Sequence, residues 1–131
     1  MTHDGSLCEK TIGEIGVAIA VQRLLLAGYS VAVPLVDHGY DLLAFEERGR
    51  SWRIQVKATA GTRNRVNIRC GRKSLKRYTP DDIDAIVAVH VLRGDALCVP
   101  VAGIAGRSHV GFATSAQFGD FSVLRRAKRL R

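Results

Sequence analysis

The stretch Trp-Arg-Ile-Gln-Val-Lys-Ala-Thr, residues 52–59, predicts its own local structure more clearly than any other part of the sequence. Residues that favour strands are frequent in it, and polar and apolar residues alternate. Because successive side chains of a strand point to opposite faces of a sheet, Gln55 and Lys57 share one face. The other face carries the apolar side chains of Ile54, Val56 and Ala58. We therefore expect a polar pair facing a cleft and an apolar face packed against a helix.

The flanking sequence predicts neighbouring strands. Two strand-like runs precede this stretch, and turns at His38-Gly39 and Arg48-Gly49 indicate hairpins between them. A short strand and then two apolar runs joined at Arg93-Gly94 follow it, and the two runs are typical of a buried strand and its hairpin partner. These predicted segments are residues 30–35, 40–45, 66–70, 84–92 and 96–101. From Ala102 onward the Gly- and Ala-rich sequence predicts no element.

A long helix is expected before the strands. Ser6 and Glu9 have the spacing of a capping box, and Gly28 is placed to end the helix after about five turns. Its predicted inward stripe consists of Val17, Ala18, Val21, Leu24 and Leu25. One turn before that stripe lies Glu14, between Gly13 and Gly16, which favour a close approach of another backbone. This order of elements predicts an α/β fold in which the helix packs on one mixed sheet.

Length and charge limit the possible functions. The 131 residues match one domain, which we assign to residues 1–123, followed by a basic tail at residues 124–131. The net charge of +8 indicates a polyanionic partner, with nucleic acid as the commonest, although a basic surface can also serve solubility alone. Three cysteines without metal-site spacing, and no long apolar run, predict a cytoplasmic protein that does not enter a membrane.

A possible catalytic group emerges from the strand pairing. Asp41 opens the strand before Gln55 and Lys57, and the hairpin at Arg48-Gly49 would bring the two strands together. Hard oxygen ligands of this kind bind Mg²⁺, and an ammonium group can offset negative charge in a transition state. The combination is chemically suited to cleavage of a phosphodiester bond.

The ordered set Gly13-Glu14, Tyr40-Asp41 and Gln55-Val56-Lys57 resembles the PD-(D/E)XK nuclease superfamily. Within it, the sequence is most similar to the group I intron-associated homing endonucleases and more distantly to Holliday-junction resolvases. The similarity covers about residues 11–101 and includes the acidic segment before the apolar strand and Val99-Pro100. The resemblance implies a restriction-endonuclease-like mixed sheet of about five strands and a metal-dependent DNA endonuclease.

The resemblance also implies roles for individual residues. Asp41, Gln55 and Glu14 would bind Mg²⁺ or Mn²⁺, and Lys57 would be the catalytic lysine. Gln55 departs from the pattern, because most of the superfamily has an acid there, but the homing-endonuclease subgroup is similar in having Gln. The neutral amide removes one negative charge and weakens metal binding unless Glu14 compensates.

Each of these residues also has a structural interpretation. Asp41 could cap the turn after Gly39, and Gln55 with Lys57 could lie on an edge strand facing solvent. Glu14 could form an ion pair. The acids Asp81, Asp82 and Asp84 are better explained by a turn and a strand entry than by a metal site.

Basic residues gather directly after the predicted active strand. We expect them, with Thr59, to contact DNA phosphates without reading the sequence: Arg63, Arg65, Arg69, Arg72, Lys73, Lys76 and Arg77. A solvated charged loop is the alternative. RNA binding is disfavoured because only one aromatic residue, Tyr78, lies in this segment.

Two classes of function therefore remain. The first is a Mg²⁺-dependent DNA endonuclease, which would need a homodimer or higher homo-oligomer to cut both strands. The second is a DNA-binding module that has kept the fold and lost catalysis, with Gln55 as the trace of that loss.

Overall fold

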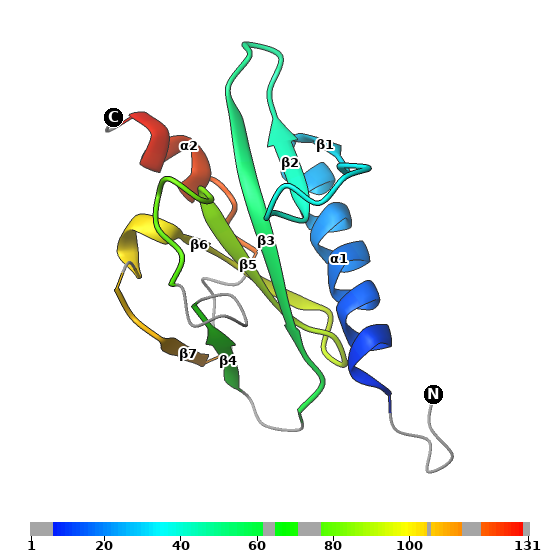
Figure 1. Cartoon of the computed structure of the whole chain (residues 1–131). Coiled ribbons are helices and arrows are strands. Elements are labelled where there is room, and N and C mark those ends of the chain that lie inside the picture. The colour runs from blue at the N-terminus through cyan, green and yellow to red at the C-terminus, as the bar shows by residue number, and fades with distance from the viewer. Residues whose placement is uncertain (1–6, 62–64, 71–76, 105, 114–118, 130–131) are drawn as a thin grey trace.

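The structure is a computed structural model and describes residues 7–61, 65–70, 77–104, 106–113 and 119–129. Within these ranges lie two α-helices and seven strands (Figure 1). They are α1 (Glu9–Leu26), β1 (Ser30–Ala32), β2 (Leu42–Phe45), β3 (Ser51–Thr59), β4 (Arg65–Arg69), β5 (Ala85–His90), β6 (Asp95–Pro100), β7 (His109–Ala113) and α2 (Val123–Arg129). A 3-10 helix, Val101–Gly103, follows β6. No helix in the described ranges is long and apolar enough to cross a membrane.

The main sheet has five strands in the order β1-β2-β3-β5-β6. Strands β3 and β5 are parallel, and the other neighbours are antiparallel, so the sheet is mixed as predicted. The predicted hairpins β2–β3 and β5–β6 turn at Gly49 (φ +84°) and Gly94 (φ +69°). Glycine adopts such a positive φ more easily than other residues do. The sequence did not predict that β4 pairs with β7 in a separate two-stranded sheet.

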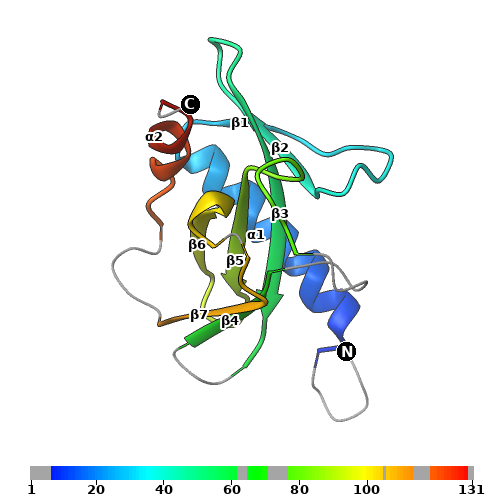
Figure 2. The same ribbon diagram turned by 60° about the vertical axis from the view of Figure 1, so that its left-hand side comes forward.

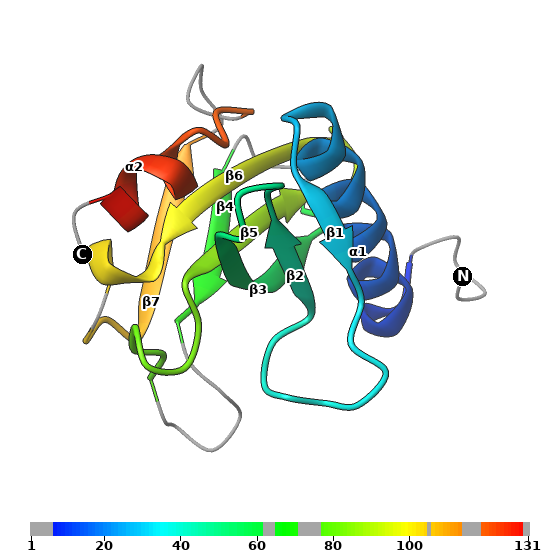
Figure 3. The same cartoon turned by 90° about the horizontal axis from the view of Figure 1, so that it is seen from above.

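The main sheet is covered on both faces (Figures 2 and 3). Helix α1 lies on one face, over a core that includes Leu24, Ile54 and Trp52. A second core, containing Ile86 and Tyr78, lies on the opposite face, where Val110 and Phe112 of β7 pack against it. Strand β5 is buried at all six positions because both layers cover it. This double burial explains its continuous apolar sequence.

Helix α1 approaches β3 closely at Gly16. A Cβ atom added there would lie 2.6 Å from the Cβ of Ala58, whereas one added at Gly13 would meet nothing within 4 Å. The predicted close approach is therefore correct for Gly16 and wrong for Gly13. The buried face of α1 consists of Gly16, Ala20 and Leu24, which are spaced by four residues. The predicted stripe was wrong at Ala18 and Leu25, which are exposed, because the helix turns the row through Gly16, Ala20 and Leu24 toward the sheet.

The two ends of α1 differ from each other in how well they were predicted. The helix begins at Glu9 with Cys8 as its N-cap and no side-chain capping bond, so the predicted capping box does not start it. Ser6 lies outside the described residues. At the other end, Gly28 has φ +94°, and the backbone N–H of Tyr29 donates to Leu24 at 3.1 Å. Gly28 therefore ends the helix as expected.

Part of the segment predicted to be a tail forms helix α2 and packs on the sheet. Leu124 is only 1% exposed, and its carbonyl accepts a hydrogen bond of 3.0 Å from the Trp52 indole. Arg125 pairs with Glu46 at 2.8 Å and lies over the ring of Tyr29. A hydrogen-bond acceptor for Trp52, and part of the core around it, thus come from a segment that the sequence marked only by its charge.

Candidate active site

Asp41 is held at the start of β2 by two contacts with β3. Its backbone N–H donates to the Ile54 carbonyl at 2.9 Å, and its Oδ2 atom accepts from the Val56 backbone N–H at 2.8 Å. The carboxylate is therefore fixed across the β2–β3 pair. The turn next to it is capped instead by Asp37, whose Oδ1 accepts from the Gly39 N–H at 2.8 Å. The alternative interpretation of Asp41 as the cap of that turn is thus wrong.

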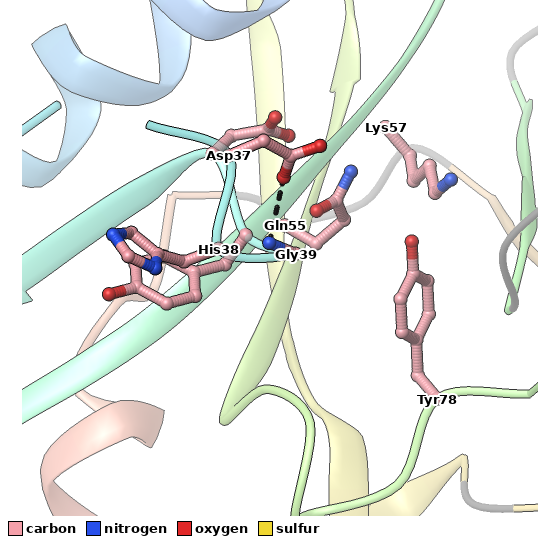
Figure 4. A pocket seen from close by; sticks show the side chains of 8 residues that line it. Asp37, His38, Gly39, Gln55, Lys57 and Tyr78 are labelled. Carbon is pink, nitrogen blue, oxygen red and sulfur yellow. Dashed lines mark hydrogen bonds between the residues drawn. The ribbon is translucent and has the colours of Figure 1, made fainter. Parts of the chain in front are cut away.

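Gln55 and Lys57 lie together on the face of β3 opposite α1. They pair with Ile86 and Ala88 of β5, which belong to the core on that face, while Ile54 and Val56 belong to the core under α1. Since β3 has β2 on one side and β5 on the other, the edge-strand interpretation is wrong. Gln55, Lys57 and Asp41 line one pocket of about 690 Å³ (Figure 4). The structure thus brings together the three residues that the sequence predicted to converge.

Asp41 and Lys57 carry opposite charges, and both lie partly buried in this pocket. Burial raises the pKa of the Asp41 carboxyl, and the hydrogen bond from Val56 and the charge of Lys57 oppose this change. Burial also lowers the pKa of the Lys57 ammonium, and the charge of Asp41 opposes that change. Each charge therefore depends on the other. A phosphate group and a cation entering the pocket would each meet a partner of opposite charge.

Glu14 lies beside this pocket. It is exposed on α1 and lines a neighbouring pocket of about 470 Å³. Asp41 and Gln55 line both pockets, which connects Glu14 to the group, whereas Lys57 lines the first pocket alone of the two. Among the described residues there is no cluster of three or more His, Cys, Asp or Glu residues that could hold a metal ion. A cation held by Asp41 would therefore depend on amide or water oxygens as well.

The proposed DNA-contacting residues are described only in part. Arg63, Arg72, Lys73 and Lys76 lie outside the described residues, and Arg65 is placed only as part of strand β4. Arg69 is exposed on β4, and its charge acts on Lys57 and lowers the pKa of that ammonium. Arg77 is exposed and donates to the Gly106 carbonyl at 2.8 Å, which gives it a structural contact. Thr59 ends β3, and its hydroxyl accepts from the Gly61 N–H at 3.4 Å.

Four further residues line the pocket, and the sequence did not single them out as functional. Tyr78 is buried, and the Lys57 ammonium lies 5.5 Å from the centre of its ring; Figure 4 shows the ring pointing toward Lys57. His38 and Tyr40 stack with ring centres 6.1 Å apart. Asp37 completes the set. The spacing Asp37-His38-Gly39 is typical of a side-chain-capped turn and could have indicated Asp37, but nothing local indicates that Tyr78 reaches Lys57.

The acidic group after the basic segment has structural roles. Asp82 accepts from the backbone and hydroxyl of Thr79, at 3.0 and 3.2 Å. Asp84 accepts from the Arg53 backbone N–H at 2.8 Å as β5 begins, and the Arg53 guanidinium also donates to it. The predicted turn and strand entry are confirmed.

Comparisons with known proteins concern the family and the fold of this chain. The model of a family described as PD-(D/E)XK endonuclease matches residues 7–114. A solved structure described as that of a bacterial homing endonuclease, I-Ssp6803I, is similar with a TM-score of 0.69 and 21% sequence identity; the match covers 95% of this chain and 98% of that one. At this identity the likeness supports the fold. No curated protein is a significant match in sequence.

Proposed function

Because this chain belongs to the PD-(D/E)XK endonuclease family, we propose that it hydrolyses phosphodiester bonds of DNA in a metal-dependent reaction. The observation that carries the proposal is the convergence of Asp41, Gln55 and Lys57 on one pocket from two paired strands. A carboxylate, an amide and an ammonium group in one pocket are the groups needed to hold a cation and a phosphate together.

The donor atoms of this pocket fit a hard divalent cation such as Mg²⁺ or Mn²⁺. Asp41 uses Oδ2 to accept from Val56, and Oδ1 is available to bind a cation. Gln55 offers an amide oxygen, and Glu14 can reach the group from the neighbouring pocket. Oxygen donors of these types are those that Mg²⁺ prefers. When bound, the cation would polarise the phosphate and lower the pKa of a bound water molecule.

Lys57 is proposed to offset the negative charge that develops on the phosphate. Its ammonium lies in the same pocket as Asp41 and is partly dehydrated, so its interaction with an anion is stronger than in bulk water. The ring of Tyr78 supports the ammonium from the side of the second core. These contacts limit the directions in which Lys57 can point and so prepare it for the transition state.

We propose that the DNA backbone follows the basic segment after β3 and that Thr59 and Arg69 contact its phosphates. Arg69 is exposed and close enough to influence Lys57, which suits a contact with a phosphate next to the cleaved bond. Each chain has one such pocket in our proposal. Cleavage of both strands would therefore require two copies, and we propose a homodimer or a higher homo-oligomer.

The competing proposal is a DNA-binding module without catalysis. The neutral Gln55 favours it, because the pocket then holds less negative charge for a cation.

The two proposals differ in one assay, conversion of supercoiled plasmid to open-circular and linear forms with Mg²⁺ or with a chelator. We expect the wild type to cleave the plasmid with Mg²⁺ and not with the chelator. Asp41→Asn should cleave it under neither condition. Binding of the plasmid without cleavage under both conditions would support the module instead. Linear and branched DNA substrates in the same assay would define the preferred form.

A further inference from the structure

The neutral Gln55 raises the question of which group supplies the missing negative charge. Two carboxylates other than Asp41 line the two pockets, namely Glu14 and Asp37. The sequence drew attention to Glu14, because a helix-borne carboxylate is part of the family pattern. The contacts in the structure favour the other residue.

Asp37 lines the pocket that holds the rest of the group, whereas Glu14 lines the adjoining one. The pocket of about 690 Å³ is lined by Asp37 together with Asp41, Gln55 and Lys57. Figure 4 shows the Asp37 carboxylate and the Gln55 amide directed into the same part of this pocket. Glu14 is exposed on α1 and shares its pocket with Lys10, Gly13 and Val17.

The backbone holds Asp37 in this orientation. Its Oδ1 atom accepts from the Gly39 N–H at 2.8 Å, which is one hydrogen bond of a tight turn. Gly39 has φ +84°, a conformation that other residues adopt only with strain. This bond uses Oδ1 and leaves Oδ2 as a second acceptor. The turn therefore fixes the orientation of the carboxylate through Oδ1, and Oδ2 can still bind a cation.

The charge of Asp37 also reaches Asp41. Asp37 and Asp41 line the same pocket, and of the two side-chain charges that act on the Asp41 carboxyl, that of Asp37 has the same sign. Two carboxylates that repel each other in a shared pocket are stabilised when a cation lies between them.

We propose that Asp37 is the second carboxylate ligand of the divalent cation and makes up for the neutral Gln55. The inference rests on the proposed metal-dependent function and assigns the site one more residue of this chain. Asp37, Asp41 and Gln55 would then offer two charged oxygens and one neutral oxygen, and water would complete the coordination. Glu14 would contribute less than Asp37 to binding of the cation.

Direct measurement of Mn²⁺ binding tests this assignment without relying on cleavage. Free Mn²⁺ is measured by electron paramagnetic resonance during titration of the full chain. Asp37→Asn suits the test, because an Asn oxygen still accepts from Gly39 and the turn is kept while the charge is lost. The control is Asp120→Asn, which makes the same change in a turn where Asp120 accepts from the Ser122 N–H at 3.1 Å.

We expect Asp37→Asn to weaken Mn²⁺ binding by about tenfold or more, Glu14→Gln to weaken it less, and Asp120→Asn to leave it unchanged. Adding Gln55→Glu to Asp37→Asn should restore affinity, because the charge returns to the same pocket. If Asp37→Asn binds like the wild type while Asp41→Asn loses binding, this inference fails and the proposed function stands. If the wild type binds no Mn²⁺, both fail.

Discussion

The pair Gln55 and Lys57 shows what residue spacing alone can predict. A strand alternates with a period of two, so two polar residues two positions apart must share a face, and the hairpin at Gly49 brings Asp41 beside them. Asp37 and Tyr78 could not be placed in this way. Tyr78 enters the pocket because its N–H donates to the Cys70 carbonyl and its ring packs in the second core, which are tertiary contacts.

At Asp41 the arrangement needed for function should reduce stability. Because burial raises the pKa of its carboxyl in the folded chain, the ionised form disfavours folding above that pKa, and the cost disappears below the unfolded value near pH 4. We expect Asp41→Asn to raise the free energy of unfolding at pH 7 in the presence of a chelator, but not at pH 3.5. Urea denaturation at the two pH values measures this.

Asp120 provides the contrast for that measurement. Hydrogen bonds from Ser122 lower the pKa of its carboxyl, so its charge favours folding at neutral pH. Asp120→Asn should therefore change stability in the opposite direction at pH 7. A loss of stability in Asp41→Asn at pH 7 would mean that the bond from Val56 and the charge of Lys57 outweigh the burial of Asp41.

At the scale of elements, the strands were predicted better than the packing of α1. The alternation of β3 and the apolar runs of β5 and β6 predict these strands from local sequence. The buried face of α1 is centred on Gly16 and Ala20, whose small side chains give a weak hydrophobic signal. Strand β7 was missed because it depends on pairing with β4. Its own sequence, His109–Ala113, has only two large apolar residues, Val110 and Phe112, with a glycine between them, which is a weak strand signal.

Two glycines of α1 allow a paired test of its packing. Gly16→Ala should destabilise the protein by about 1–3 kcal/mol, because the new Cβ would lie 2.6 Å from the Cβ of Ala58. Gly13→Ala should stabilise it by about 1 kcal/mol, because nothing lies within 4 Å and Ala favours helix. Urea denaturation of both variants gives the comparison.

The double variant Gly16→Ala with Ala58→Gly identifies the cause. Removing the methyl group of Ala58 should recover part of the stability lost in Gly16→Ala, since the two changes concern one contact. Equal stabilisation by both Gly→Ala changes would show that helix propensity alone determines the result and that the close approach to β3 is relaxed.

At the scale of the whole molecule, the net charge of +8 does not show which basic residues contact DNA, so individual residues have to be tested. If Arg69 contacts a phosphate, Arg69→Ala should lower the slope of log affinity against log salt by about 0.9. Arg72→Ala with Lys73→Ala should lower it by roughly two units and weaken all sequences alike. Binding titrations over a range of salt concentrations measure both.

Arg48 is the matched control for the salt dependence. It lies in the exposed turn between β2 and β3, at the end of the hairpin away from β4 (Figure 1). Arg48→Ala should leave the slope unchanged. An unchanged slope in the Arg69, Arg72 and Lys73 variants would instead move the DNA surface elsewhere, and the basic residues at the C-terminal end of the chain would be the next to test.

The central claim is that the Asp41, Gln55 and Lys57 pocket cleaves DNA, and the most direct test separates binding from cleavage in one variant. DNA affinity and single-turnover cleavage with Mg²⁺ are measured for the wild type, Lys57→Ala and Arg48→Ala. We predict that Lys57→Ala binds DNA nearly as well as the wild type and cleaves it at least about a hundredfold more slowly, while Arg48→Ala cleaves normally. Cleavage by Lys57→Ala at the wild-type rate would contradict the account.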